Sequence, residues 1–231
     1  MSPDSGPRAA EYPDADGTPG TLSPPTDRTR VRRLPKRGRY DRSTVEAILD
    51  EAVVGHVAWT LDGQPYATPT NVWRQGDRLY WHGSAASRML RATDGQPVCV
   101  TITHLDGFVL ARSGFNHSVN YRSVMVLGTA HLVTDEAEVD AALHALIEHL
   151  YPGRAATLRP MTAKERKATS VMWIDLAEAS AKVRADVNHD DEGDETWPVW
   201  GGVVPVRMIR GAPEPDEFVA DGMTPPEVRL P

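Results

Sequence analysis

Six short segments rich in β-branched and aromatic residues, joined by links of hairpin length, constrain this chain more than any other feature. The segments are Val53–Thr60, Tyr66–Trp73, Arg78–His82, Pro97–Thr103, Gly107–Ala111 and Arg122–Val133. Asp62-Gly63, Gln75-Gly76-Asp77 and Asp106-Gly107 lie between neighbouring segments and are typical of tight reversals. The pattern predicts an antiparallel meander or a small barrel.

Helical patterns surround these segments. Ser43 and Glu46 have the spacing of a capping box at the start of an apolar stripe. A longer stripe with helical period occupies residues 139–150 and ends before Pro152-Gly153, and Thr162 with Glu165 forms a second capping box. Extended pieces are expected at 171–176 and 181–187. The expected fold class is therefore mainly β or α+β.

Composition divides the chain into three parts. Residues 1–27 are rich in Pro, Gly, Ser, Thr and Asp, and residues 28–42 contain eight arginines and lysines that form either a solvated linker or an arm that binds phosphate. We expect a disordered tail and basic arm over residues 1–32, one domain over 33–210 and an irregular tail over 211–231. Trp197 and Trp200 predict that the end of the domain docks on a surface.

Several classes of protein are disfavoured. Cys99 is the only cysteine, which excludes an intrachain disulfide and fits a reducing cytoplasm. The net charge of −7 argues against a protein that coats nucleic acid. No apolar run reaches the roughly 20 residues of a membrane span, and the first residues have no apolar signal core. His144 and His149 are five residues apart, which does not suit a helical metal site, so no metal site is expected.

Two polar stretches are candidates for chemistry. His82 leads into Gly83-Ser84-Ala85-Ala86-Ser87-Arg88, where small residues, hydroxyls and a guanidinium could bind an anion; ordinary helix capping is the alternative. His117 lies in the run 116–123, which suits either a surface loop or the edge of a polar ligand site. Cys99 lies in an apolar strand pattern typical of a structural thiol.

Four motifs carry a resemblance to a known family. They are Gly55-His56-Val57-Ala58, Pro65-Tyr66-Ala67-Thr68-Pro69, Leu79-Tyr80-Trp81-His82-Gly83-Ser84 and Asn120-Tyr121-Arg122-Ser123-Val124-Met125-Val126-Leu127-Gly128. In this order they resemble the pyridoxamine 5′-phosphate oxidase-like superfamily, and within it the flavin-binding branch that includes the nitroimidazole-resistance proteins. The likeness extends from about Arg33 to Pro205.

The resemblance implies an antiparallel FMN-binding split β-barrel with peripheral helices, working as a homodimer with flavin at the subunit interface. Ser87-Arg88 matches the family's phosphate-binding pair, whereas Met89 stands where many members have a lysine. The other implied cofactor contacts are Thr70, Asn71 and Val72 along the ring, His82, Gly83 and Ser84 at the phosphate and ribityl end, Thr101 near the phosphate, and Tyr121, Arg122, Ser123 and Trp200 from the interface side.

The resemblance therefore implies an FMN-dependent oxidoreductase in the cytoplasm, acting on a small, aromatic or nitro-bearing substrate, with NAD(P)H as a candidate donor and with no nucleic acid or membrane partner. His82 and His117 are the candidate catalytic residues. One alternative is a haem-binding split barrel in which a histidine ligates the iron. Another is a flavin-binding sensor without enzymatic activity.

Overall fold

The strands form one antiparallel sheet. The computed structural model describes residues 24–220 and 222–228. The strands are β1 (Gly38–Arg39), β2 (Val54–Leu61), β3 (Gln64–Gln75), β4 (Arg78–Ser84), β5 (Pro97–Leu110), β6 (Ser118–Thr129), β7 (His131–Leu132), β8 (Thr169–Asp175), β9 (Ala179–Arg184) and β10 (Gly202–Pro205). Their order is β1-β9-β6-β5-β2-β3-β4-β8-β7, and β10 pairs with β5. The predicted antiparallel, mainly β fold is confirmed, and among the described residues no ladder joins the two ends into a closed barrel.

Glycine-containing turns set the register of the first strands. Asp62 and Gly63 connect β2 to β3 with φ values of 50° and 78°, the left-handed pair that a type I′ hairpin needs. Gly76, with a φ of 56°, lies in the turn between β3 and β4. Both predicted reversals are therefore confirmed, and they hold β2, β3 and β4 side by side.

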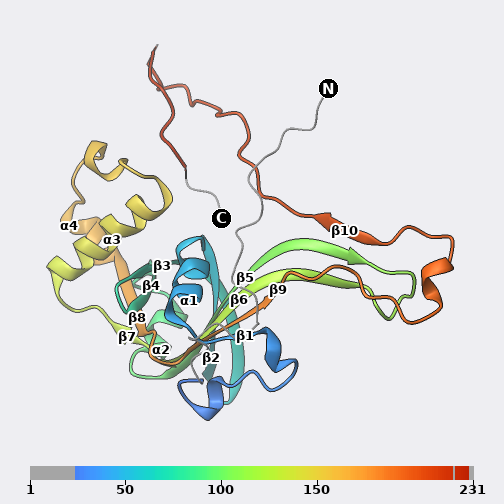
Figure 1. Cartoon of the computed structure of the whole chain (residues 1–231). Helices are drawn as coiled ribbons and strands as arrows, with labels where there is room; N and C mark the ends of the chain where they lie inside the picture. Colours follow the sequence, from blue (N-terminus) through green and yellow to red (C-terminus); the bar gives the residue numbers. More distant parts are fainter. Residues whose placement is uncertain (1–23, 221, 229–231) are drawn as a thin grey trace.

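The third predicted reversal, at Asp106-Gly107, is wrong. β5 continues through it, and the pairing with β6 shifts by one residue between Leu105 and Gly107, which is a β-bulge. Asp106 accepts hydrogen bonds from Arg122, and β10 pairs alongside Gly107. The result is a long β5–β6 hairpin that extends away from the rest of the sheet, with β10 beside it (Figure 1). We call this hairpin, together with residues 194–205 that end in β10, the arm.

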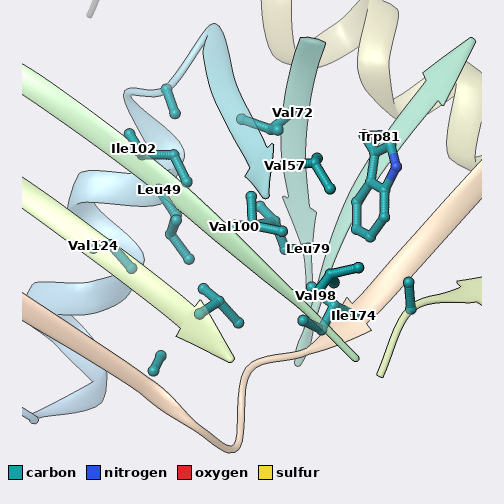
Figure 2. Close-up of a cluster of buried hydrophobic side chains, with 14 of the residues drawn as sticks. Leu49, Val57, Val72, Leu79, Trp81, Val98, Val100, Ile102, Val124 and Ile174 are labelled. Atoms are coloured by element: carbon teal, nitrogen blue, oxygen red, sulfur yellow. The ribbon is translucent and has the colours of Figure 1, made fainter. Parts of the chain in front are cut away.

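The sheet curls around one apolar core. Alternate residues of β2 and β5, such as Val57 and Val100, are fully buried, as the period of two in a strand requires. Leu49 of α1 (Arg42–Asp50) and Leu90 of α2 (Arg88–Thr93) pack against the same cluster. Figure 2 shows side chains from β2, β3, β4, β5, β6, β8 and α1 converging there. One face of the curled sheet is thus filled by the protein itself.

A second cluster lies on the other face of β3, β4 and β8. It contains Trp73, Tyr80 and Val171 beneath apolar residues of α3 (Glu136–Leu150). The short helix α4 (Ala163–Ala168) follows and begins at the predicted Thr162–Glu165 capping box. Both helices lie at the end of the molecule opposite the arm (Figure 1). They cover only part of this face and leave the remainder, over β2, β5 and β6, without a helix.

The 3₁₀ turns complete the connections. They are η1 (Asp27–Thr29), η2 (Pro35–Arg37), η3 (Ala155–Thr157) and η4 (Asp194–Thr196). Thr29 is buried, and β1 pairs with β9. The basic stretch of residues 28–42 therefore runs along the edge of the sheet. Residues 1–23 of the expected tail lie outside the described residues.

Asp41, rather than Ser43, caps α1. Its carboxylate accepts the Thr44 N–H at 2.8 Å, and Ser43 donates its hydroxyl to the same carboxylate at 2.9 Å. Partial burial opposes ionisation of Asp41, but the hydrogen bonds from Thr44 and Ser43 outweigh it and lower the pKa. The sequence pattern did not single out Asp41 because Asp41 and Ser43 are both good N-cap residues and lie only two positions apart.

Replacing Asp41 with Ala is expected to cost about 1 kcal/mol of unfolding free energy, whereas Asn, an equally good cap, should cost far less. The pKa of Asp41 is lower in the folded than in the unfolded protein. The stabilisation by its charge is therefore fully present above the unfolded pKa of about 3.9 and is lost as the pH falls through the folded pKa. Urea unfolding of the two variants at neutral and acid pH measures both effects. Equal losses in Asp41→Ala and Asp41→Asn at neutral pH would contradict the assigned cap.

Candidate functional site

An uncovered face of the sheet carries several of the predicted site residues. On β2 the exposed residues Val54 and His56 alternate with the buried Gly55 and Val57. Cross-strand pairing places His56 opposite Pro69 of β3 and Thr101 of β5. We call this surface the outer face; it comprises Val54, His56 and Ala58 of β2, Ala67, Pro69 and Asn71 of β3, Cys99, Thr101 and Thr103 of β5, and Ser123, Met125 and Leu127 of β6.

The outer face is a shallow mixed surface. Val54 is 48% exposed, while Thr101, Ser123 and Met125 are half-buried. Asn71 donates its side-chain amide to the Val53 carbonyl at 3.1 Å, so that group braces the start of β2. The half-buried Cys99 has a raised pKa because burial disfavours the thiolate. Apolar and hydroxyl-bearing side chains thus share an uncovered face of the sheet, a surface that can take a planar ligand.

His82 lies where the outer face meets the cluster under α3. Trp73 follows Asn71 by two residues and therefore shares its side of β3, and the rings of Trp73 and His82 are 5.9 Å apart at 61°. The Nδ1 atom of His82 is buried without a hydrogen-bond partner in the described part of the chain. Burial lowers the pKa of His82, so its imidazole is neutral over a wider range of pH. A neutral imidazole of this kind has the chemistry to serve as a metal ligand or a proton acceptor, although Nδ1 itself is enclosed by protein.

Arg88 marks a second position, at the far end of the β2–β3 hairpin. Its guanidinium lies 4.7 Å from the centre of the Tyr66 ring, and Tyr66 stacks on Trp59 at 4.6 Å. Among residues 24–220 and 222–228, no carboxylate forms an ion pair with Arg88, whose side chain is exposed. From the Trp59–Tyr66 pair to the Val54–Asn71 pair is five residues, about 17 Å along the strands. Because five is an odd number of residues, Trp59 and Tyr66 face the core side of these strands, so Arg88 lies on the opposite side of the hairpin from the outer face.

The backbone N–H groups of the turn before α2 already have hydrogen-bond partners within the protein. The Ala85 N–H donates to the Ala168 carbonyl, and the Ala86 and Ser87 N–H groups donate to Ser84. The Ser87 hydroxyl accepts the Leu90 N–H as the cap of α2. A Cβ added at Gly83 would lie 3.2 Å from the Leu90 side chain, so the position leaves little room for a larger residue. The amides of residues 85–87 are thus already used, and the Arg88 side chain is the strongest remaining donor of this turn.

Three predicted contacts point elsewhere. Val72 is fully buried in the core. Arg122 pairs with Asp106 and with Glu51, on the opposite side of β6 from Tyr121 and Ser123. Thr70 donates its hydroxyl to the His82 carbonyl at 3.3 Å. The structure therefore brings Asn71, His82, Thr101 and Ser123 onto one face and holds the side chains of Val72 and Arg122 away from it.

His117 and Trp200 lie on the arm. His117 has its Nδ1 2.8 Å from the Ser113 carbonyl and lines a pocket with Phe108, Leu110 and Val204. The neighbouring Ser118–Val109 pair is six residues beyond Thr103 along β5, about 20 Å from the outer-face residues. Trp197 and Trp200 are 64% and 63% exposed. Within the chain, His117 and His82 do not share a site.

The described residues contain no cluster of three or more His, Cys, Asp or Glu side chains suited to a metal ion. None of the helices in the same part of the chain has the length and apolar character to cross a bilayer.

Comparison with known proteins identifies the relatives of this architecture. The family described as pyridoxamine 5′-phosphate oxidase matches residues 41–183. None of the curated proteins compared matches the sequence. Two solved structures are similar over most of both chains. The flavocytochrome Anf3 from Azotobacter vinelandii is 45% identical with a TM-score of 0.86, covering 91% of this chain and 100% of that one.

The second similar structure is a protein from Mycobacterium smegmatis described as binding FAD and haem. It is 36% identical with a TM-score of 0.78, covering 82% of this chain and 94% of that one. A candidate 5-nitroimidazole antibiotic resistance protein from Bacteroides thetaiotaomicron shares the fold, with 23% identity, a TM-score of 0.53 and coverage of 63% and 86%.

Proposed function

The chain belongs to the pyridoxamine 5′-phosphate oxidase family, and we propose that it is a redox protein that binds both a flavin and a haem. The observation that carries this proposal is the buried, unpartnered Nδ1 of His82. It gains weight because the two similar structures are a flavocytochrome and an FAD- and haem-binding protein. The haem alternative raised by the sequence thus joins the flavin hypothesis instead of competing with it.

His82 fits the role of haem ligand. A neutral imidazole nitrogen is the commonest protein ligand of haem iron, and burial keeps the His82 ring neutral. The edge of Trp73 fixes the orientation of that ring, and the apolar residues under α3 exclude water from one side of it. His117 is the second candidate, since its Nδ1 is engaged with the Ser113 carbonyl and its Nε2 is left to bind.

We assign the flavin ring to the outer face and its phosphate to Arg88, which lies on the core side at the turn end of the β2–β3 hairpin. Arg88 would pair with a phosphate, because a guanidinium without a carboxylate partner is a strong donor to phosphate oxygens. Thr101 and Ser123 would place hydroxyls along the flat outer face. The choice of FAD over the FMN implied by the resemblance is supported by the similar structure described as binding FAD and haem.

A second copy of the chain is proposed to cover the outer face. The exposed Trp197, Trp200 and Phe115 of the arm are large apolar groups that one subunit leaves in water, at 64%, 63% and 93% exposure. Burial of such aromatic groups is a major source of interface stability. We propose a homodimer whose arms contribute to the cofactor sites.

The chemistry that the two cofactors supply when bound is hydride transfer at the flavin and single-electron transfer at the haem. The protein would position them, keep His82 neutral and admit a small substrate, with a reduced nicotinamide as the proposed donor.

Titration of cofactor-free protein tests the flavin assignment. Quenching of flavin fluorescence should show tighter binding of FAD than of FMN. In a second experiment, NADPH or NADH is added anaerobically to haem-loaded protein with and without flavin, and the haem should be reduced only when flavin is present. Haem reduction at the same rate without flavin would contradict the proposed transfer, and equal affinity for FMN would contradict the choice of FAD.

A further inference from the structure

We propose that Trp73 and Tyr80 form an electron relay that ends at His82. Inside the cluster under α3, the ring centroids of His82 and Trp73 are 5.9 Å apart, and those of Trp73 and Tyr80 are 5.8 Å apart with an interplanar angle of 18°. Trp73 is fully buried and Tyr80 is 5% exposed. The inference rests on the proposed haem at His82 and adds to it a path made of the chain's own side chains.

The two relay residues differ in what happens to their protons. Tryptophan and tyrosine are the side chains that lose a single electron most readily, and each becomes more acidic when it does so. The Nε1 of Trp73 is buried without a hydrogen-bond partner in the described residues, so Trp73 has no acceptor for its proton. Tyr80 donates its hydroxyl to Oε1 of Glu138 at 3.3 Å. Oxidation is therefore expected to pass through Trp73 and to settle on Tyr80.

Arg78 ends the relay at Tyr80. Trp173 of β8 pairs across the sheet with Tyr80 and would be the next ring. The Arg78 guanidinium lies 3.7 Å from the centre of the Trp173 ring and also pairs with Glu138 at 2.8 Å. A positive charge over the face of a ring attracts its π electrons and opposes removal of one of them. The Trp173 ring is thus harder to oxidise; Arg78 also interacts with the Tyr80 hydroxyl, whose proton Glu138 accepts.

The proposed step uses hydrogen peroxide as the oxidant at the His82 site. Tyr80 gives up one electron, which reaches that site through Trp73; the phenolic O–H bond breaks, and the proton forms an O–H bond on the Glu138 carboxylate. A bound haem would supply the second electron. The two electrons, together with two protons from solvent, reduce one hydrogen peroxide to two waters. The relay moves one oxidising equivalent from the cofactor site to Tyr80 and moves the phenolic proton to a carboxylate whose side chain is 39% exposed.

Electron paramagnetic resonance of frozen samples tests the relay. Haem-loaded protein mixed with hydrogen peroxide is expected to give a tyrosyl radical that is lost in Tyr80→Phe and in Trp73→Phe and is retained in the control Trp173→Phe. Glu138→Gln removes the charge of a side chain that is 39% exposed and nearly keeps its shape, and it should lose most of the signal even if Trp73→Phe fails to fold. An unchanged tyrosyl signal in Tyr80→Phe or in Glu138→Gln would overturn the relay.

The Soret band, recorded before peroxide is added, separates this test from the proposed function. A protein with no Soret band refutes the haem assignment and the relay with it. A protein with bound haem and no tyrosyl radical at Tyr80 refutes the relay alone.

Discussion

Replacing His82 with alanine is expected to abolish the Soret band of the haem-loaded protein. The substitution removes the half-buried imidazole and with it the proposed bond to iron. Because burial lowers the pKa of His82, the wild-type Soret band should also persist to lower pH than an ordinary imidazole ligand would allow. Absorption spectra of the variant and a pH titration of the wild type measure the two effects.

Three comparisons make the His82 result specific. His117→Ala and His56→Ala remove other histidines and should keep the Soret band. Added imidazole should restore the band to His82→Ala by filling the space left by the ring, and circular dichroism should show that the variant is folded. An unchanged band in His82→Ala together with a lost band in His117→Ala would move the haem ligand to the arm.

Charge reversal at Arg88 is expected to weaken flavin binding by about 100-fold. Removing a hydrogen bond to a charged group costs about 1.5–3 kcal/mol, a factor of about 10 to 100, and a glutamate would also repel phosphate, which places the effect at the upper end. The guanidinium lies on Tyr66, so Arg88→Lys should give an intermediate loss because lysine keeps the charge without the planar fork. Flavin fluorescence titrations give the affinities.

Lys164→Glu is the control for Arg88→Glu. Lys164 is an exposed residue in the first turn of α4, away from Tyr66 and Trp59, and its substitution changes the net charge by the same amount. Equal weakening by the two substitutions would show a general electrostatic effect and would contradict a phosphate contact at Arg88.

Local sequence determined much of the fold. Asp62-Gly63 specifies its hairpin because both residues tolerate positive φ, and Thr162 with Glu165 specifies the start of α4 within four residues. Asp106-Gly107 has the same local pattern as a hairpin, but the pairing of β10 with β5 and the bonds from Arg122 keep the strand continuous. Those partners lie far away in sequence, so the local pattern could not reveal them.

The candidate site was predictable only in part. The alternation of a strand would have separated Arg122 from Tyr121 and Ser123, and Val72 from Asn71, since neighbouring residues face opposite sides. The unpartnered Nδ1 of His82 could not be predicted, because it depends on which side chains of β3 and of the cluster under α3 surround the ring. Whether Arg88 forms an ion pair with a carboxylate likewise depends on tertiary structure.

The absorption spectrum of the protein as purified, with release and identification of the bound chromophores by mass spectrometry, tests the central proposal most directly. We expect a Soret band together with flavin absorption, and the release of both haem and FAD. A colourless protein that takes up neither added haem nor added flavin would contradict it.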